Sequence, residues 1–387
     1  MNDYNVIVVG AGPAGATAAR NCAKGGLKTL LLEKEEVPRE KRCGGGISSG
    51  TLKELDFELP EDIVERRCVG MRAIQGKVKN EVRVSHCVAT MVTRSKFDAF
   101  LIEKAVESGA KLQQKEPCLS VKVTGDGVKV TTSSGEYSAD AVIGADGVYS
   151  VVAKSFRPPF SQEELRYCIV ADVPMEKEKL DKFLPDMVEL HYGYIDMGYA
   201  WLFPKKDYIA AGVAGAFTQA KGLKEKFKGF LKLHGFDENV QFKGCLIPIS
   251  KFKNDSYSDR IILTGDAAGF VDCFSGEGIR FAVASGKYAA GTLIKARKEN
   301  DFSKEFLKNY QDAFYKEFKG DLKSSILLTN LSFRYPDMLL GTLIRNDDVI
   351  VNYYKVMSAE MTFRQYMRWL MPRVPYFILK RLFGKKN

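Results

Sequence analysis

The chain has 387 residues, of which 45% are hydrophobic and 27% are charged. The length favours two domains with an appendage, and the composition is that of a globular protein with a packed core. No stretch approaches the roughly 20 apolar residues of a spanning helix, and no signal-type segment precedes the first strand. Eight scattered cysteines without a CxxC pair and only three histidines argue against a zinc site or a disulfide framework. We therefore expect a cytoplasmic protein with reduced thiols and no metal.

The net charge of +10 is concentrated at one end of the chain. Residues 361–387 contain seven Lys or Arg and no Asp or Glu, so the other 360 residues carry only +3. This tail also contains Phe, Tyr, Trp, Leu and Ile, a mixture suited to an anionic lipid headgroup layer. A packed or solvated helix is the simpler alternative. No nucleic-acid fold signature accompanies the basic tail, so we expect no nucleic acid as a partner. From the composition of the tail we expect a peripheral contact with the inner face of the cytoplasmic membrane.

The strongest motif is a strand, glycine-rich turn, helix and second strand within residues 5–32. Gly10 allows the tight turn, Gly12 allows a pyrophosphate to approach the backbone, and Gly15 allows the helix to pack on the strand. Glu33 closes the second strand, 18 residues after Gly15, where an acid accepts hydrogen bonds from a ribose diol. An isolated GxGxxG also occurs at ordinary strand-to-helix corners, but this ordered set predicts a dinucleotide site.

Two later strands end in motifs that an NAD domain does not need. One strand, at 137–144, ends in Gly-Ala-Asp-Gly at 144–147, and another ends in Gly265-Asp266. With the first motif, these stretches resemble the flavoprotein superfamily of the aromatic hydroxylases and geranylgeranyl reductases. The resemblance implies FAD as the cofactor, with Asp266 binding its ribityl chain. It also implies that a helix at 279–298 points its positive end at the pyrimidine side of the flavin ring.

Three further segments resemble the geranylgeranyl reductase family in particular. They are RCGGGIS at 42–48, TRSKFDAFL at 93–101 and GYAWLFPK at 198–205. The resemblance covers about residues 1–300, and the last segment is the most family-specific. The positions that match the family's FAD-binding residues are Gly10, Gly12, Pro13, Ala14, Gly15, Glu33, Lys34, Arg42, Cys43, Gly44, Arg94, Asp146, Gly147, Gly265, Asp266, Gly276, Gly278 and Ile279.

The chain departs from the family pattern at two positions of the glycine turn before residue 279. Cys273 stands where the family usually has Pro, so either the turn is more mobile or the thiol faces the site. Glu277 stands where the family usually has a third Gly, which puts a carboxylate near the substrate side if the residue points inward. These departures affect the substrate assignment more than the expected FAD binding.

The order of motifs predicts an α/β FAD-binding domain of the Rossmann-like, glutathione-reductase type. An antiparallel β-sheet substrate domain is inserted into it, because the segments between the motifs show alternating or β-branched and aromatic patterns. A helical C-terminal region with the basic tail follows, broken at Pro336, Pro372 and Pro375. The expected boundaries are 1–75, 93–155 and 255–298 for the FAD domain, 76–92 and 156–254 for the substrate domain, and 299–387 for the helical region.

The family resemblance implies reduction of isoprenoid double bonds, in lipids, prenyl diphosphates or quinones. Such a bond has no carbonyl to polarise it, so hydride delivery from the flavin needs a general acid nearby. The candidates are Cys43, Tyr199 and Glu277, each of which also has an ordinary structural interpretation. Together with Tyr199, the residues Trp201 and Phe203 are expected to form an aromatic wall for a long apolar chain, unless they are simply core.

No second GxGxxG unit is present, so the electron donor is either transiently bound NAD(P)H or a ferredoxin-like protein. Two other functional classes stay open at this point. One is an FAD-dependent monooxygenase or halogenase on the same scaffold, although the chain has no W-x-W-x-I-P stretch. The other is a flavoprotein that only transfers electrons. Oxygen dependence separates the reductase from the monooxygenase, and steady turnover with a prenyl substrate excludes the electron carrier.

Overall fold

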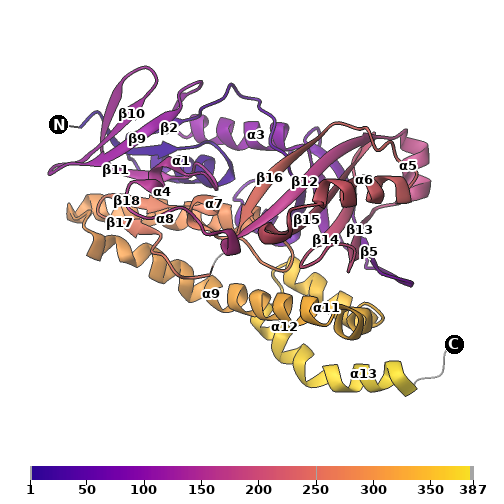
Figure 1. Ribbon diagram of the computed structural model, residues 1–387. Coiled ribbons are helices and arrows are strands. Elements are labelled where there is room, and N and C mark those ends of the chain that lie inside the picture. Colours follow the sequence, from indigo (N-terminus) through magenta and orange to yellow (C-terminus); the bar gives the residue numbers. More distant parts are fainter. Residues whose placement is uncertain (1, 250, 384–387) are drawn as a thin grey trace. The chain divides into compact units, whose positions relative to one another are not determined.

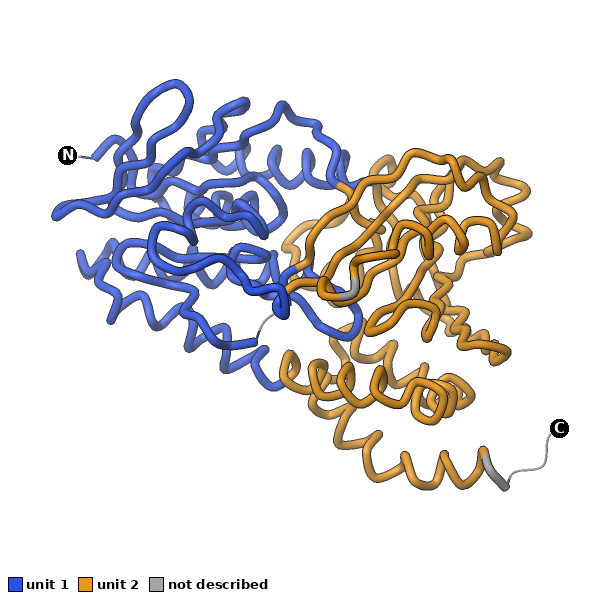
Figure 2. Tube along the Cα trace, in the orientation of Figure 1, with its two compact units in different colours: residues 1–41, 94–164, 248–320 blue, residues 42–93, 165–247, 321–387 orange. Residues whose placement is uncertain are grey.

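The computed structural model describes residues 2–249 and 251–383, without the side chains of Gln219, Leu382 and Phe383. The chain forms two compact units, each assembled from three segments (Figure 2). Unit 1 comprises Met1–Lys41, Arg94–Glu164 and Pro248–Gly320. Unit 2 comprises Arg42–Thr93, Leu165–Ile247 and Asp321–Asn387. The polypeptide therefore passes between the units several times, as the interleaved motifs predict.

Unit 1 is built on a sheet whose central strands run parallel (Figure 1). Strand β1 (Tyr4–Val9) pairs in parallel with β2 (Thr29–Leu32) and with β11 (Glu136–Gly144). Four consecutive apolar residues of β1 are buried, as expected for a strand covered on both faces. The sheet order is β17-β18-β11-β1-β2-β8, with β10 on β11 and β9 on β10. These further strands are β8 (Lys111–Gln113), β9 (Cys118–Val123), β10 (Val128–Thr132), β17 (Tyr257–Ser258) and β18 (Ile261–Leu263).

Small residues let the helices of unit 1 pack closely around this sheet. Helix α1 packs against α3 and α8, whereas α4 packs against β9. A Cβ on Gly286 of α8 would lie 2.5 Å from the Ala14 carbonyl oxygen of α1, so no larger residue fits at this crossing. The helices of unit 1 are α1 (Pro13–Lys24), α3 (Arg94–Glu107), α4 (Val151–Lys154), η1 (Gln162–Glu164), α7 (Gly265–Ala268), α8 (Ile279–Glu299) and the first part of α9 (Lys304–Arg334).

The main sheet of unit 2 has seven strands in the order β16-β12-β15-β14-β13-β5-β6. Six of these strands lie in the segments whose alternating or β-branched and aromatic patterns predict the inserted sheet. The remaining strand, β5, was not predicted, and it pairs in parallel with β13, so the sheet is mixed rather than purely antiparallel. The seven strands are β5 (Gly70–Gln75), β6 (Val78–Arg83), β12 (Leu165–Pro174), β13 (Met187–Tyr192), β14 (Tyr199–Pro204), β15 (Tyr208–Ala216) and β16 (Phe242–Pro248).

The two faces of this sheet differ in chemistry because side chains alternate along each strand. Ala200 and Leu202 of β14 belong to a hydrophobic core together with residues of α5 (Lys177–Phe183) and α6 (Leu223–Leu233). Trp201, between them in sequence, belongs to a separate cluster on the other face with the partly buried Tyr199 and Phe203. A short turn, η2 (Phe217–Gln219), precedes α6.

A small three-stranded sheet and one helix complete the first part of unit 2. Its strand order is β3-β7-β4, and both pairings are antiparallel. The elements are β3 (Gly46–Ser48), α2 (Ser49–Glu54), β4 (Val64–Cys68) and β7 (Ala89–Val92). The Ser48 side chain accepts a hydrogen bond from the Thr51 N–H and thereby caps α2.

The C-terminal part of the chain is helical, as predicted. Helix α9 ends before Pro336, whereas Pro375 lies in the first turn of α13, where a proline is tolerated. The apolar side chains of α12 are buried, namely Phe363, Tyr366, Met367 and Leu370. No helix among the described residues combines the length and apolar character needed to cross a bilayer. The elements are η3 (Pro336–Leu340), α10 (Gly341–Leu343), α11 (Asp347–Met357), α12 (Phe363–Leu370), η4 (Met371–Arg373) and α13 (Val374–Phe383).

The observed units differ most from the expected domain boundaries at two places, and residues 156–164 and 248–254, expected in the substrate domain, also lie in unit 1. Residues 42–75, expected in the FAD domain, belong to unit 2 because β5 pairs with β13 and β4 pairs with β7. The C-terminal region is not a separate body, since the long helix α9 starts in unit 1 and ends in unit 2. The last residues of the basic tail, 384–387, lie outside the described part of the chain.

Candidate active site

Two glycines of the first glycine turn are required by the packing of the chain itself. Gly10 has φ +96°, and a Cβ there would lie 2.5 Å from the Ala145 carbonyl oxygen. A Cβ on Gly15 would lie 1.7 Å from the Gly10 carbonyl oxygen. Both glycines therefore allow β1, α1 and the end of β11 to meet at one point.

Gly12 differs from its neighbours because the space beside it is open. The nearest atom to a Cβ on Gly12 would be Arg39 Nη2, at 3.9 Å. Gly12 is the N-cap of α1, no side chain caps the helix, and its first turn contains no acidic residue. The unpaired N–H groups and the dipole of a helix N-terminus favour an anion at this position. The turn therefore fits a pyrophosphate that approaches Gly12.

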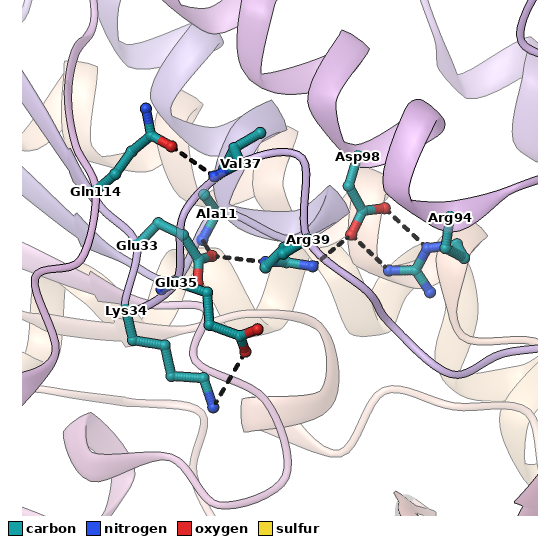
Figure 3. A network of polar contacts seen from close by, with 9 residues as sticks. All are labelled: Ala11, Glu33, Lys34, Glu35, Val37, Arg39, Arg94, Asp98 and Gln114. Carbon is teal, nitrogen blue, oxygen red and sulfur yellow. Dashed lines mark hydrogen bonds and ion pairs between the residues drawn. The ribbon is translucent and has the colours of Figure 1, made fainter. Parts of the chain in front are cut away.

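Glu33 is held in place by three groups at the end of β2 (Figure 3). Its Oε2 atom accepts a hydrogen bond from the Ala11 N–H at 3.0 Å and lies 3.1 Å from Arg39 Nε. Its Oε1 atom accepts a hydrogen bond from the Glu35 N–H at 3.1 Å. Glu33 is 3% exposed, so its carboxylate is fixed beside the turn rather than solvated. The side chain of Lys34, in contrast, is 71% exposed.

Arg39 continues this network to a second carboxylate, Asp98 of α3 (Figure 3). Arg39 Nη1 lies 3.1 Å from Asp98 Oδ2. Arg94 donates two hydrogen bonds to the same carboxylate, from Nε at 2.8 Å and from Nη2 at 2.9 Å. Two guanidinium groups thus balance two carboxylates, which makes their burial tolerable. Arg39 and Asp98 were not predicted as site residues, and Arg94 is anchored by Asp98.

Asp146, in the second motif, is used within the chain as a helix cap. Its carboxylate accepts hydrogen bonds from Ser150 Oγ at 2.5 Å and from the N–H groups of Val151 and Val152 at 2.7 and 3.2 Å. Burial raises the pKa of Asp146, although these hydrogen bonds oppose the change. Gly147 has φ +79°, which favours glycine at this turn. The predicted contact of both residues with the cofactor stays a prediction.

The third motif joins α1 to α8. Gly265 has φ +54°, and a Cβ there would lie 3.0 Å from Ala14 Cβ and 3.3 Å from Ala282 Cβ. The half-buried Asp266 carboxylate receives no hydrogen bond from any described residue. Its Oδ1 atom would lie 3.6 Å from a Cβ on Gly278, the N-cap of α8. A fixed, unpartnered carboxylate beside an uncapped helix fits a hydroxyl-bearing ligand such as a ribityl chain.

The loop before α8 is fixed by an acidic residue rather than by a proline. Asp272 Oδ1 accepts hydrogen bonds from the Phe274 N–H at 3.0 Å, the Ser275 N–H at 2.6 Å and Ser275 Oγ at 2.7 Å. The Asp272 N–H donates to the Glu277 carbonyl oxygen at 2.9 Å. Gly276 needs its φ of +71° to close this turn. Asp272 thus restrains the turn that contains Cys273.

In unit 2, the glycine-rich loop at 42–46 closes on a buried lysine. Lys205 is 1% exposed, and its Nζ donates to the carbonyl oxygens of Gly45 at 3.2 Å and Val92 at 2.9 Å. Burial lowers the pKa of Lys205 to about 8. Gly45 has φ +63°, and its Cβ would lie 2.8 Å from Lys205 Nζ, so glycine is required. Sequence reasoning missed Lys205, although it ends the GYAWLFPK segment.

The same loop contains Cys43 and contacts the aromatic residues of β14 through Gly44. The Gly45 N–H donates to Cys43 Sγ at 3.4 Å, and Cys43 is half-buried. A Cβ on Gly44 would lie 2.7 Å from the Phe203 ring and 3.0 Å from Trp201 Nε1. Trp201 Nε1 is buried without a hydrogen-bond partner among the described residues. The loop therefore lies directly on the aromatic face.

Three residues of β14 form a row with one residue of β13. Ring centroids are 5.9 Å apart for Tyr192 and Tyr199, 5.7 Å for Tyr199 and Trp201, and 6.1 Å for Trp201 and Phe203. Tyr199 and Phe203 are half-buried. We call Tyr192, Tyr199, Trp201 and Phe203 the aromatic row. Arg42, at the start of the glycine loop, pairs with Asp172 of β12 at 3.2 Å.

The predicted site residues are divided between the two units. The candidate proton donors Cys43 and Tyr199 belong to unit 2, whereas Glu277, which is half-buried, belongs to unit 1. Arg42, Cys43 and Gly44 are the predicted cofactor residues of unit 2, and all others belong to unit 1. Unit 1 therefore contains a dinucleotide-type site, and unit 2 contains a thiol beside the aromatic row.

Comparisons with known proteins show which family the chain belongs to. The family model of an FAD binding domain matches residues 3–199. The digeranylgeranylglycerophospholipid reductase of Methanocaldococcus jannaschii is 32% identical over 89% of this chain and 91% of its own. The chloroplastic geranylgeranyl diphosphate reductase of Nicotiana tabacum is 31% identical over 82% of this chain and 73% of its own.

A solved structure shares the fold over nearly the whole length. The crystal structure of a geranylgeranyl bacteriochlorophyll reductase-like protein from Thermoplasma acidophilum has a TM-score of 0.78 and 24% identity, and the match covers 98% of this chain and 99% of that protein. Unit 1 has the glycine turns, the acid after β2 and the unpartnered Asp266, a set of groups that fits FAD. The chain belongs to the geranylgeranyl reductase family of FAD-dependent oxidoreductases.

Proposed function

We propose that the protein reduces carbon–carbon double bonds of isoprenoid chains carried by lipids, prenyl diphosphates or quinones. The names of its relatives in Methanocaldococcus jannaschii and Nicotiana tabacum support this substrate class. The aromatic row is the structural observation that supports this proposal, because neighbouring rings on one sheet face suit an extended apolar chain. Tyr199 and Phe203 are half-buried, so part of each residue is available to a ligand.

Unit 1 would hold the cofactor through the groups described above. The open N-terminus of α1 at Gly12 would bind the pyrophosphate, with Arg39 Nη2 beside it. Glu33 would accept the ribose hydroxyls, and Asp266 would accept a ribityl hydroxyl. When bound, FAD supplies the hydride chemistry. The residues of unit 1 therefore bind and orient the cofactor, and none of them needs to transfer a proton.

Cys43 is the proton donor that we favour. The Gly45 N–H occupies one side of the sulfur, so the thiol proton is free to point elsewhere. Lys205 donates a hydrogen bond to the carbonyl oxygen of Gly45 and thereby fixes the turn whose Gly45 N–H contacts the sulfur. Tyr199, in the aromatic row, is the second candidate of the same unit. Glu277 would act from unit 1 only if its carboxylate faces the substrate.

The membrane contact of the tail is proposed for α13 rather than for α12. The apolar side of α12 is buried, which supports the packed-helix interpretation for that segment. Around α13, the exposed fractions are 40% for Met371, 62% for Tyr376 and 54% for Leu379. Arg373 and Lys380 lie among them and are also exposed. Exposed aromatic and aliphatic residues between cations suit an anionic headgroup layer.

The decisive experiment is turnover of an unsaturated prenyl lipid under anaerobic conditions. Reduced protein with a digeranylgeranyl lipid should yield products that are heavier by two hydrogens for each reduced bond, measured by mass spectrometry. NADH, NADPH and reduced ferredoxin, offered separately, identify the electron donor. A product formed only when oxygen is admitted would favour the monooxygenase, and a protein that exchanges electrons without any product would be an electron carrier.

A further inference from the structure

A polar cluster lies on the helix-covered face of the seven-stranded sheet in unit 2. Glu189 and His191 are two residues apart on β13, so their side chains leave the same face. His234 is the C-cap residue of α6. One ligand atom from each of the three side chains lies within 4.8 Å of the other two. Two of the three histidines of the chain therefore meet at one carboxylate.

The hydrogen bonds of this cluster leave one buried nitrogen unsatisfied. His191 Nε2 lies 2.6 Å from Glu189 Oε1, and Arg72 Nη1 donates to Glu189 Oε2 at 2.8 Å. His234 Nε2 lies 3.8 Å from Glu189 Oε1, which is beyond hydrogen-bond distance. That nitrogen is buried and has no hydrogen-bond partner in the described part of the chain. A buried polar atom without a partner is unfavourable, so a further group at this point would stabilise the cluster.

Phenylalanine rings surround the two histidines. The Phe230 ring centroid lies 5.0 Å from that of His191 and 4.8 Å from that of His234. Phe183 and Phe236 also contact the His234 ring, at 6.2 and 5.8 Å between centroids. An apolar surround limits access of water and strengthens the interaction of a cation with a buried carboxylate.

We propose that Glu189, His191 and His234 bind a divalent transition-metal ion, with Zn²⁺ as the expected occupant. Two imidazoles and one carboxylate form the three-ligand set of open zinc sites, which keep a fourth position for water. Ligand bonds of about 2.0–2.2 Å place tetrahedral donors roughly 3.4 Å apart. The ion would replace the 2.6 Å hydrogen bond between His191 Nε2 and Glu189 Oε1, with the His191 proton on Nδ1 instead. The 3.8 Å separation of His234 Nε2 from the same oxygen needs only a small adjustment. Arg72 holds the second carboxylate oxygen and orients the ligand.

The ion would join the end of α6 to β13, on the sheet face opposite the aromatic row. Its role is then to fix this helix on the substrate sheet, independently of the proposed reduction. Sequence patterns do not predict this site, because His191 and His234 are 43 residues apart and match no metal-binding spacing.

Cobalt binding to the flavin-loaded, chelator-washed protein tests this proposal. Co²⁺ should bind one per chain and give ligand-field absorption at longer wavelengths than the oxidised flavin, and Zn²⁺ should abolish that absorption by displacement. His234→Gln should weaken binding at least tenfold, since even the loss of a group that only orients a ligand costs 10–100-fold, roughly. His191→Gln should weaken it at least as much.

His86→Gln is the matched control, because His86 is exposed and is not among the three clustered ligands. This variant should bind Co²⁺ as the wild type does. Flavin content and the circular dichroism spectrum report whether each variant is folded, and His234→Gln alone is sufficient if His191→Gln does not fold. Folded wild-type protein without the cobalt absorption, or binding that His234→Gln leaves unchanged, would show that the residues form a hydrogen-bonded cluster only.

Discussion

Glycines in two turns of the molecule are needed for opposite physical reasons. In unit 1, Gly12 faces open space, with no atom nearer to its Cβ position than Arg39 Nη2 at 3.9 Å. In unit 2, Gly44 and Gly45 face the chain's own groups, a Phe203 ring at 2.7 Å and Lys205 Nζ at 2.8 Å. Gly12 leaves room for a ligand, whereas the other two leave room for the protein. Substitution should therefore separate binding from folding at Gly12 but not at Gly44 or Gly45.

The largest expected effect follows from Gly12→Val. A Cβ at this position would be in ordinary contact with Arg39 Nη2 alone, at 3.9 Å, so the fold should persist, but the valine occupies the space above the N-terminus of α1. We expect a folded, colourless protein that does not take up added FAD, as measured by flavin absorbance and circular dichroism.

Gly125→Val is the control for that substitution. A Cβ on Gly125 would meet no atom within 4 Å, and the residue does not have a positive φ. This variant should keep its flavin. Gly44→Val should instead impair folding or the aromatic row, because its side chain collides with Phe203 and Trp201. Full flavin content in Gly12→Val would refute the assignment of the open turn to the pyrophosphate.

Cys43→Ala tests the chemistry assigned to the loop of unit 2. If the thiol donates the proton, reoxidation of reduced flavin by substrate should slow by about a hundredfold or more, the usual range for loss of a general acid. Stopped-flow absorbance under anaerobic conditions measures the rate. Cys87→Ala, at another half-buried thiol of the same unit, should retain the wild-type rate. An unchanged rate in Cys43→Ala would leave Tyr199 as the candidate of unit 2.

A smaller effect is expected on membrane binding. Arg373→Gln with Lys380→Gln removes two exposed cations near α13. Each cation near an anionic surface contributes about 1 kcal/mol, so liposome affinity should fall roughly thirtyfold. Co-sedimentation with phosphatidylserine vesicles measures the change, and turnover of a short, dispersed prenyl substrate should not change. Equal sedimentation of wild type and variant would show that α13 does not contact the bilayer electrostatically.

The smallest expected effect concerns the pH dependence of stability. Burial lowers the pKa of Lys205 from 10.5 to about 8 in the folded chain, so above pH 8 the unfolded chain binds more protons at this residue. The contribution of Lys205 to the free energy of unfolding should therefore rise with pH, by on the order of 1 kcal/mol between pH 8 and 9. Lys205→Met should remove this rise, as measured by urea unfolding of both proteins. Parallel curves for the two proteins would show that Lys205 titrates normally.

The sequence predicted unit 1 better than unit 2 because its signals are local. The run of β1, α1 and β2 follows from apolar strands, a glycine turn and the residues that flank them, all within about 30 positions. Arg39 could not be found in this way, because its two carboxylate partners come from β2 and α3. Asp98 lies in the TRSKFDAFL segment, but nothing in that segment showed that it binds Arg94 and Arg39.

Unit 2 depends on pairings between distant segments. β5 was missed because the sequence GMRAIQ gives a weak strand pattern, and its parallel pairing with β13 joins residues more than 100 positions apart. The burial of Lys205 was equally hidden, since a lysine that follows a strand is usually solvated. Alternation alone did place Tyr199, Trp201 and Phe203 on one face of β14.

Anaerobic single-turnover reoxidation of the reduced flavin tests the central claim most directly. The account predicts that a geranylgeranyl lipid restores the oxidised flavin spectrum without oxygen, one equivalent of double bonds being consumed for each flavin, whereas the fully saturated lipid leaves the flavin reduced. If the flavin stays reduced with every unsaturated prenyl lipid and reoxidises only when oxygen is admitted, the assignment as an isoprenoid reductase is contradicted.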